Sequence, residues 1–300
     1  MKKSAIKHFV GCSLLLIFCA VAMTQTAPPP VTKIFLVDVT NHNGQMKVSK
    51  PVSITAFEGY NNQPSFLPDG RSLFFTSIRE GGQADIYRYD LGTGATVRVT
   101  ETRESEFSPT VTPDRKFFSV VRVEADQTQR LWKFPIAGGT PSLVLQKIKP
   151  VGYHVWIDAH TLALFVLGTP STLQLVDVLT EHTEVIAQNI GRTLLMIPHQ
   201  KKLSFVQKIS EQEFEIKSFD LKTRQTATLI KALPGNEFFT WTPRGEILMA
   251  KGSKLYKWNP AHDSDWQEVA DFSSAGISEI TRIAVSPNGN KIAFVAKAGR

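Results

Sequence analysis

The chain has 300 residues, of which 42% are hydrophobic and 20% are charged. This balance is that of a soluble globular protein and excludes a chain that is mainly disordered. The formal net charge is +7, but no run rich in Lys and Arg follows the N-terminal segment, so no nucleic-acid interface is indicated.

Residues 1–27 have the order of a secretory signal peptide. Three lysines precede an apolar stretch from about Phe9 to Met23, and small residues follow it. Ala20–Ala22 fits a small-x-small cleavage site, with cleavage after Ala27 as the alternative. An uncleaved membrane anchor is the competing interpretation, but the apolar run is short for a span of roughly 20 residues. We therefore expect residues 1–27 to be a signal peptide and spacer, and the mature protein to be periplasmic or secreted without a membrane span.

Both cysteines, Cys12 and Cys19, lie inside this segment. The mature chain would therefore have no disulfide and no Cys-ligated metal. A lipid anchor on one of them is an alternative, although neither HFVGC nor LIFC matches the Leu-x-small run that precedes a modified cysteine. Removal of the three leader lysines brings the net charge close to +4, so the basic balance is partly a property of the leader.

Two β-like segments, Ile34–Val39 and Met46–Thr55, open the mature chain. The next element is PSFLPDGRSLFFTS, residues 64–77. There Pro68, Asp69 and Gly70 are the residue types of a tight turn, because proline presets φ, aspartate bonds its own backbone and glycine adopts a positive φ. Aromatic and apolar runs on both sides predict the two strands of a β-hairpin.

The same hairpin recurs five more times along the chain. Counted at the position of Pro68, with Ile157 in place of the missing proline, the steps are 45, 44, 41, 45 and 44 residues. The copies are TVTPDRKFFSVVRV, WIDAHTLALFVL, MIPHQKKLSFVQK, WTPRGEILMAK and AVSPNGNKIAFVAK. A fixed period of this length is the signature of a repeat architecture.

A third and a fourth strand follow each hairpin except the last, as in IYRYDL and TVRVT. The sixth hairpin reaches Arg300 without them, and Ile34–Val39 with Met46–Thr55 supply the missing pair. An open solenoid would need distinct caps at its ends, whereas complementary half-units indicate a closed ring. The sequence thus predicts an all-β, six-bladed β-propeller of four-stranded antiparallel blades over residues 33–300, and we expect a monomer.

The repeats resemble those of a known superfamily. FLPDGRSLFFTS followed by ADIYRYDLGTGATVRVT, and VSPNGNKIAFVA near the C-terminus, are similar to the WD-like repeats of TolB-like six-bladed propellers. TolB itself carries an α/β domain before its propeller, and no room for one exists between the leader and Ile34, so the resemblance implies the wider superfamily and not TolB itself. Such repeats also occur in peptidase propellers, sensor ectodomains and sugar-acid lyases, and fold alone does not choose among these functions.

No catalytic constellation is present in the sequence. It lacks the nucleophile motif G-x-S-x-G and the zinc motif H-E-x-x-H, and its histidines are scattered among different units. Carboxylates that recur after the third strand are of the type that closes an Asx turn; they are Asp38, Asp90, Asp177 and Asp220. We therefore expect neither a catalytic residue nor a metal or other cofactor.

The starts of the first strands are the candidate binding positions, because the inner strands of a propeller line its central channel. Alignment of the hairpins places polar residues there that differ from unit to unit, which suits recognition better than turn formation. The candidates are Asn62, Glu106, His154, Arg192, Glu237 and Arg282.

Three functions are consistent with these observations. The leading hypothesis is an exported, non-catalytic propeller that binds a protein or peptide partner at the cell envelope. The alternative is a secreted, metal-dependent hydrolase or lyase acting on a sugar acid or lactone in the channel, for which Glu106, His154 and Glu237 are the best ligands. The third is a scaffold without a small-molecule site.

Overall fold

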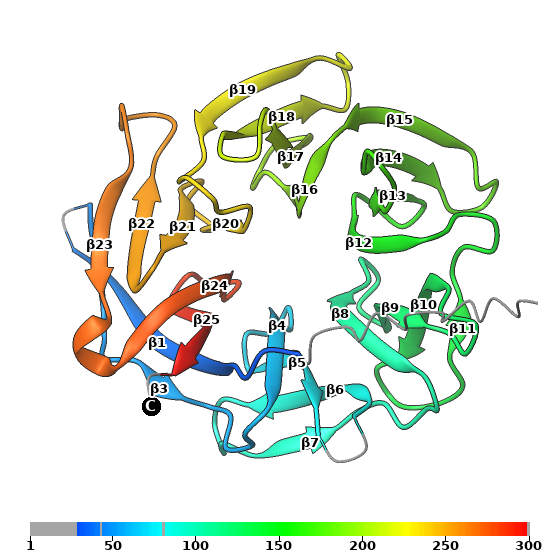
Figure 1. Cartoon of the computed structure of the whole chain (residues 1–300), viewed down its shortest axis with the longest axis horizontal. Coiled ribbons are helices and arrows are strands. Elements are labelled where there is room, and N and C mark those ends of the chain that lie inside the picture. Colours follow the sequence, from blue (N-terminus) through cyan, green and yellow to red (C-terminus); the bar gives the residue numbers. More distant parts are fainter. Residues whose placement is uncertain (1–28, 43, 80–81, 299–300) are drawn as a thin grey trace, which may run out of the picture.

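The strands pack as a ring of six antiparallel sheets, or blades, around a central axis (Figure 1). The computed structural model describes residues 29–42, 44–79 and 82–298, and the strands within these residues extend from Lys33 to Ala298. In each blade the first strand lies nearest the axis and later strands follow outward. The predicted six-bladed β-propeller is confirmed.

The first five blades each take four consecutive strands, which follow one another from the axis outward. Blade 1 contains β4 (Tyr60–Phe66), β5 (Ser72–Ile78), β6 (Ala84–Asp90) and β7 (Thr96–Arg98); blade 2 contains β8 (Ser105–Val111), β9 (Phe117–Val123), β10 (Gln129–Pro135) and β11 (Ser142–Leu143). Blade 3 contains β12 (Val151–Trp156), β13 (Thr161–Val166), β14 (Thr172–Asp177) and β15 (Thr183–Gln188); blade 4 contains β16 (Ile190–Met196), β17 (Lys202–Lys208), β18 (Phe214–Asp220) and β19 (Thr226–Lys231). Blade 5 contains β20 (Phe239–Trp241), β21 (Ile247–Lys251), β22 (Lys254–Trp258) and β23 (Gln267–Asp271), and the short 3-10 helix η1 (Ser273–Ala275) leads into blade 6.

Blade 6 combines strands from the two ends of the chain. Its inner strands β24 (Ile277–Val285) and β25 (Lys291–Ala298) are followed outward by β1 (Lys33–His42), which pairs antiparallel with β25. The outer positions are taken by β2 (Gln45–Val48) and β3 (Val52–Ser53), both paired with β1. The N-terminal strands therefore close the ring as predicted, although the segment 46–55 forms two short strands and not one.

A buried hydrogen-bond pair fastens this closure to blade 1. The hydroxyl of Thr32 donates to the backbone oxygen of Asn61 at 2.8 Å, and the side-chain amide of Asn61 donates to the backbone oxygen of Thr32 at 3.0 Å. Neither residue is more than 3% exposed. Asn61 therefore joins the two ends of the propeller and is not free to meet a ligand.

The recurring aspartates close turns, with one exception. Asp69 accepts a hydrogen bond from the backbone N–H of Arg71 at 2.9 Å, and Gly70 follows with a φ of 66°. Asp90, Asp177 and Asp220 likewise each accept bonds from the N–H groups two and three residues ahead. Asp38 differs because β1 continues to His42, so its carboxylate contacts Lys291 of the neighbouring strand instead; the turn interpretation is wrong for this residue.

The core consists of apolar side chains packed between neighbouring blades. Six clusters are found among the described residues; the one between blades 1 and 2 is built on Phe74, Phe118 and Phe134. The second strand of each blade is covered on both faces, which explains why SLFFTSI is a run of buried residues and not a strict alternation. This packing fixes the inner strands around the axis.

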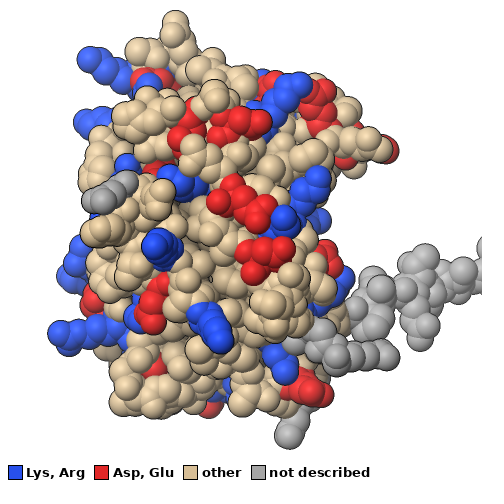
Figure 2. Space-filling view, turned by 90° about the vertical axis from the view of Figure 1, so that its left-hand side faces the viewer, with Lys and Arg blue, Asp and Glu red and all other residues tan. Residues whose placement is uncertain are grey.

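The outer side of the ring is polar and of mixed charge. On the face seen in Figure 2, Lys and Arg side chains are interspersed with Asp and Glu. Exposed pairs such as Lys254 with Glu268, 2.8 Å apart, are of a kind that contributes about 0–1 kcal/mol. Within the described part of the chain, no helix has the length and apolar character needed to cross a membrane.

Candidate functional site

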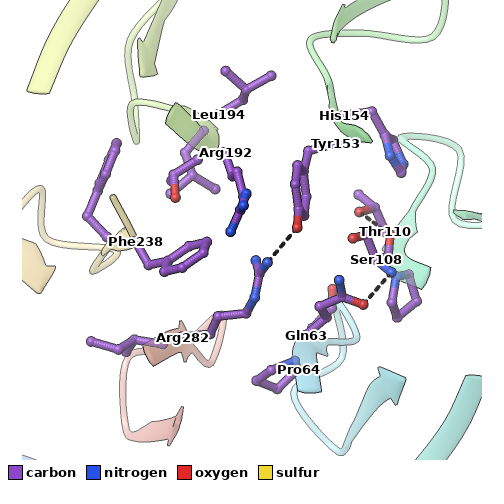
Figure 3. A pocket seen from close by; sticks show the side chains of 16 residues that line it. Gln63, Pro64, Ser108, Thr110, Tyr153, His154, Arg192, Leu194, Phe238 and Arg282 are labelled. Carbon is purple, nitrogen blue, oxygen red and sulfur yellow. Dashed lines mark hydrogen bonds between the residues drawn. The ribbon is translucent and has the colours of Figure 1, made fainter. Parts of the chain in front are cut away.

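A cavity of about 180 Å³ lies on the propeller axis (Figure 3). All six blades contribute to its wall through residues of their inner strands, and blade 5 also through Phe238, which lies just before its inner strand. Its polar and charged lining residues are Gln63, Ser65, Ser108, Thr110, Tyr153, His154, Arg192, Thr193 and Arg282, and its apolar ones include Pro64, Pro109, Leu194, Phe238 and Ile283. No carboxylate is among these residues.

Irregular pairing of the inner strands aims these side chains at the axis. The register between the first and second strands shifts near the cavity in blades 1, 2, 3, 4 and 6, and in blade 5 the inner strand begins only after Phe238. Gln63 and Ser108, one repeat apart, have φ values of 57° and 55°. Bulges of this kind turn a strand and redirect its side chains, and they are common beside functional sites.

Arg282 is the most tightly held cation at the cavity. Its Nη2 donates to the hydroxyl of Tyr153 at 2.7 Å, and its guanidinium carbon lies 4.2 Å from the ring centre of Phe238 and 5.0 Å from that of Tyr153. Figure 3 shows the guanidinium pointing into the space between these rings. Among the described residues no acidic side chain lies within ion-pair distance of Arg282. Aromatic faces and one hydroxyl therefore take the place of a counter-ion.

Arg192 is oriented by Glu237 and stays half exposed. Its Nη1 lies 3.3 Å from Glu237 Oε1, and its backbone N–H donates to Glu237 Oε2 at 3.2 Å. The same Oε2 lies 3.0 Å from Lys208 Nζ, so one carboxylate serves two cations. The side chain of Arg192 is 51% exposed and that of Glu237 12%. Part of the Arg192 guanidinium is thus available to the cavity.

A neutral wall faces the two arginines across the cavity. The side-chain oxygen of Gln63 accepts hydrogen bonds from the backbone N–H of Ser108 at 2.9 Å and from the hydroxyl of Thr76 at 2.8 Å. The bond from Ser108 joins blade 2 to blade 1 at the axis, and the bond from Thr76 fixes the Gln63 side chain within blade 1. The Ser108 hydroxyl is buried and makes no hydrogen bond within the described chain. This hydroxyl can both donate and accept a hydrogen bond, and it lies at the cavity wall.

His154 contributes no charge to the site. Its Nε2 lies 2.6 Å from the hydroxyl oxygen of Ser119, which also accepts a bond from Trp156 Nε1 at 2.9 Å and donates to the backbone oxygen of Thr110 at 3.1 Å. Burial lowers the pKa of His154 to about 3, so the ring is neutral near pH 7. Because Ser119 already donates to Thr110, the ring is assigned the tautomer with its proton on Nε2.

The Ser119 arrangement is structural and not a nucleophile with its base. The same link recurs two blades further on, where Trp241 Nε1 donates to the Ser204 hydroxyl at 2.8 Å and Ser204 donates to the backbone oxygen of Leu195 at 2.9 Å. In both places a serine of a second strand joins its own first strand to a tryptophan of the next blade.

The other predicted site residues lie away from the cavity lining. Asn62 is buried, and its side-chain oxygen accepts a bond from the backbone N–H of Gln63 at 2.8 Å. Glu106 is completely buried between blades 1 and 2, where it contacts the Thr102 hydroxyl and lies 3.2 Å from Arg122 Nε. Of the six candidates, the structure brings His154, Arg192 and Arg282 to the cavity, with Glu237 behind Arg192.

Burial also governs the ionisation of Glu106. It raises the pKa of this carboxyl from 4.5 to about 7, more than the opposing hydrogen bond from Thr102 and the charge of Arg122 lower it. Its Oε2 makes no hydrogen bond within the described chain. Glu106 is therefore a buried side chain between two blades and is not available to bind a ligand.

The residues proposed as metal ligands are not gathered into one centre. Glu106 bonds Thr102, His154 bonds Ser119 and Glu237 contacts Arg192 and Lys208. The described part of the chain contains no group of three or more His, Cys, Asp or Glu side chains with the spacing to hold a metal ion. The alternative of a metal centre built on these three residues does not agree with the structure.

Sequence reasoning missed Phe238. It lies beside the predicted Glu237, but an aromatic residue before a strand gives no sign that it will flank a cavity instead of entering the core.

The fold and the site define a six-bladed propeller with an arginine-lined axial cavity. No family model and no curated protein matches the chain. Its fold is that of the TolB-like propellers: it is similar to the structure of a protein of Agrobacterium tumefaciens assigned as a TolB, with a TM-score of 0.68 and 14% identity over 89% of this chain and 98% of that one.

TolB of Acinetobacter baumannii is similar over 89% of this chain and 65% of its own length, with 13% identity and a TM-score of 0.57. An oligogalacturonate lyase in complex with manganese has a TM-score of 0.52 and 14% identity over 91% of this chain and 99% of that one. At such identities the similarity establishes the fold and leaves the function to be argued from the site.

Proposed function

We propose that the protein is an exported, non-catalytic propeller that binds a protein or peptide partner at the cell envelope through its axial cavity. The observation that carries the proposal is the pair of arginines, Arg192 and Arg282, that converges with no carboxylate on a cavity lined by all six blades. The order of residues 1–27, which lie outside the described part of the chain, supports export. The shared fold with TolB-like propellers supports a binding role.

The size of the cavity favours a partner that inserts only a small part of itself. Sites for drug-sized ligands have volumes of roughly 300–1,000 Å³, whereas this cavity holds about 180 Å³. A second cavity of about 340 Å³ shares Phe238 with the axial cavity and is lined by Lys208, Glu237, Lys251 and Glu279 among others. The tip of a peptide in the first cavity with its remainder along the second is consistent with both volumes.

Site-specific photo-crosslinking in cells tests the proposal. A photoreactive residue at exposed Lys251, which lines the neighbouring cavity, should give an adduct of one defined mass. The same residue at exposed Lys116, in the hairpin turn after β8, should not give it. The adduct should disappear in an Arg282→Gln background. An adduct that is equal at both positions, or none at either, would contradict a partner at this end of the channel.

The alternative is an enzyme that acts on a sugar acid, and two observations favour keeping it. Arginines bind uronate carboxylates, and the chain shares its fold with an oligogalacturonate lyase. Elemental analysis of the purified protein, with activity on oligogalacturonate measured before and after chelation, separates the two functions. A stoichiometric metal whose removal abolishes lyase activity would support the enzymatic function and contradict the non-catalytic binding role.

A further inference from the structure

The guanidinium group of Arg282 is held in place by neighbouring side chains but has few hydrogen-bond partners in the described chain. The guanidinium group presents five N–H donors, and the described chain supplies one hydrogen-bond acceptor, the hydroxyl of Tyr153. Phe238 and Tyr153 flank the group at 4.2 and 5.0 Å. An arginine side chain normally loses rotamer freedom when it binds a ligand; here packing has already restricted it. The remaining donors have no acceptor in the described chain, and the side chain that carries them lines the cavity.

Arg192 supplies the second cation from blade 4, two blades from Arg282 in the ring. Figure 3 shows its guanidinium directed toward the same space as that of Arg282. Its ion pair with Glu237 uses Nη1, and Lys208 competes for the same carboxylate at 3.0 Å from Oε2. Glu237 therefore orients Arg192 without neutralising the site fully, because two basic groups share one acid.

The other titratable groups near the cavity add no negative charge. His154 is neutral because burial lowers its pKa to about 3. Burial raises the pKa of Tyr60, which lies close enough to feel the charges of Arg282 and Arg192, to about 12, so its hydroxyl stays protonated. No carboxylate lines the cavity. The local field in this partly enclosed site therefore favours an anion.

The apolar part of the wall indicates what carries the anion. Phe238, Leu194 and Pro64 offer carbon surface beside the arginines, and the volume of about 180 Å³ exceeds the roughly 30 Å³ share of one water molecule several-fold. The planar fork of a guanidinium matches a carboxylate in two parallel hydrogen bonds. A planar anion on a short carbon skeleton fits this wall better than a bare inorganic ion does.

We propose that the axial cavity recognises a single carboxylate of a peptide, bound between Arg282 and Arg192 with its carbon skeleton against Phe238. The inference rests on the proposed partner-binding function and specifies its chemistry. The carboxylate comes from a chain end or from an Asp or Glu side chain. Tyr153 is a positioning residue that orients Arg282, and Glu237 does the same for Arg192.

Isothermal titration calorimetry of the purified protein at low salt tests this chemistry directly. The probes are an acetylated Gly-Ala-Leu peptide with a free C-terminus, the same peptide amidated, an acetylated and amidated Gly-Glu-Gly peptide, and inorganic phosphate. We expect at least one carboxylate peptide to bind, the fully neutral amide to bind about tenfold or more weakly, and added salt to weaken binding. The first and third peptides distinguish a chain end from an acidic side chain.

Variants assign the binding to the two arginines. Arg282→Gln and Arg192→Gln should each lower affinity about tenfold or more, and Arg282→Lys should also lose affinity because an ammonium group lacks the planar fork. Tyr153→Phe should lose less, since only the orienting hydroxyl is removed. Arg88→Gln, at an exposed position on β6, is the control for the same change in net charge. Thermal unfolding of each variant verifies that it is folded.

Three outcomes would overturn the inference: equal affinity for acid and amide, tighter binding of phosphate than of any carboxylate, or full affinity in a folded Arg282→Gln protein. If the cellular adduct forms at Lys251 while none of the carboxylate peptides binds, the carboxylate inference fails and partner binding stands. If the carboxylate peptides bind but no macromolecular adduct forms in cells, partner binding fails instead.

Discussion

The buried carboxyl of Glu106 makes the stability of the propeller depend on pH in a direction that can be measured. The side chain has no exposed surface, and burial raises its pKa from 4.5 to about 7. The folded protein therefore binds the proton more tightly than the unfolded chain does. The stabilising contribution of protonated Glu106 is fully present below about pH 4.5 and is lost as the pH rises through about 7.

The size of the effect follows from the same shift. Each pKa unit corresponds to about 1.4 kcal/mol, so a shift from 4.5 to about 7 destabilises the ionised folded state by about 3 kcal/mol, most of it between about pH 5 and about pH 8. Glu106→Gln removes the titration and retains the shape. The difference in unfolding free energy, variant minus wild type, should therefore increase by roughly 2–3 kcal/mol over this range.

Urea unfolding at several pH values measures this difference. A difference between proteins is needed because His154, with its lowered pKa, contributes in the opposite direction: its stability is lost as the pH falls through 6.5 toward about 3. Glu101→Gln, at an exposed position on the same segment, is the matched control and should show no such trend. If the Glu106→Gln difference stayed constant with pH, Glu106 would be ionised in the folded state, and the charge of Arg122, 3.2 Å away, would outweigh burial.

Three further predictions concern the interfaces and turns. Trp241→Phe should lower the free energy of unfolding by about 1–3 kcal/mol in urea titrations, because the buried hydroxyl of Ser204 loses its donor from the next blade; no change would show that this link is dispensable. Gly191→Ala should cost about 1–3 kcal/mol and weaken peptide binding, since the new Cβ would lie 2.9 Å from Val206 and 3.1 Å from the Glu237 carboxylate that orients Arg192. Hydrogen bonds from Thr180 lower the pKa of Asp177, so the stability that its carboxylate contributes is lost as the pH falls through the pKa of the folded state. Asp177→Asn should therefore remove this part of the loss of stability at acid pH. Urea titrations in which the variant loses as much stability at acid pH as the wild type would contradict this.

The candidate site could be located from the sequence only in outline. The repeat period shows which residues fall on each inner strand, so His154, Arg192 and Arg282 are predictable as channel residues. Glu106 and Asn62 also lie on inner strands, but whether they face the channel depends on local register shifts such as the one between Phe107 and Thr110. A one-residue change of register exchanges the two faces of a strand, and nothing in a polar, irregular segment fixes it locally.

The fold can be predicted from the sequence, because the turn residues and apolar runs recur at a nearly constant period and the two ends of the chain complement each other. Which polar residues meet at the axis depends on the packing of the blades. Phe238 and Tyr153 come to flank Arg282 from two other blades, and the Tyr153 hydroxyl, 129 residues away in the chain, is 2.7 Å from its guanidinium. Such contacts depend on blade packing and bulge geometry across the axis, and these are set by the whole ring rather than by any single repeat.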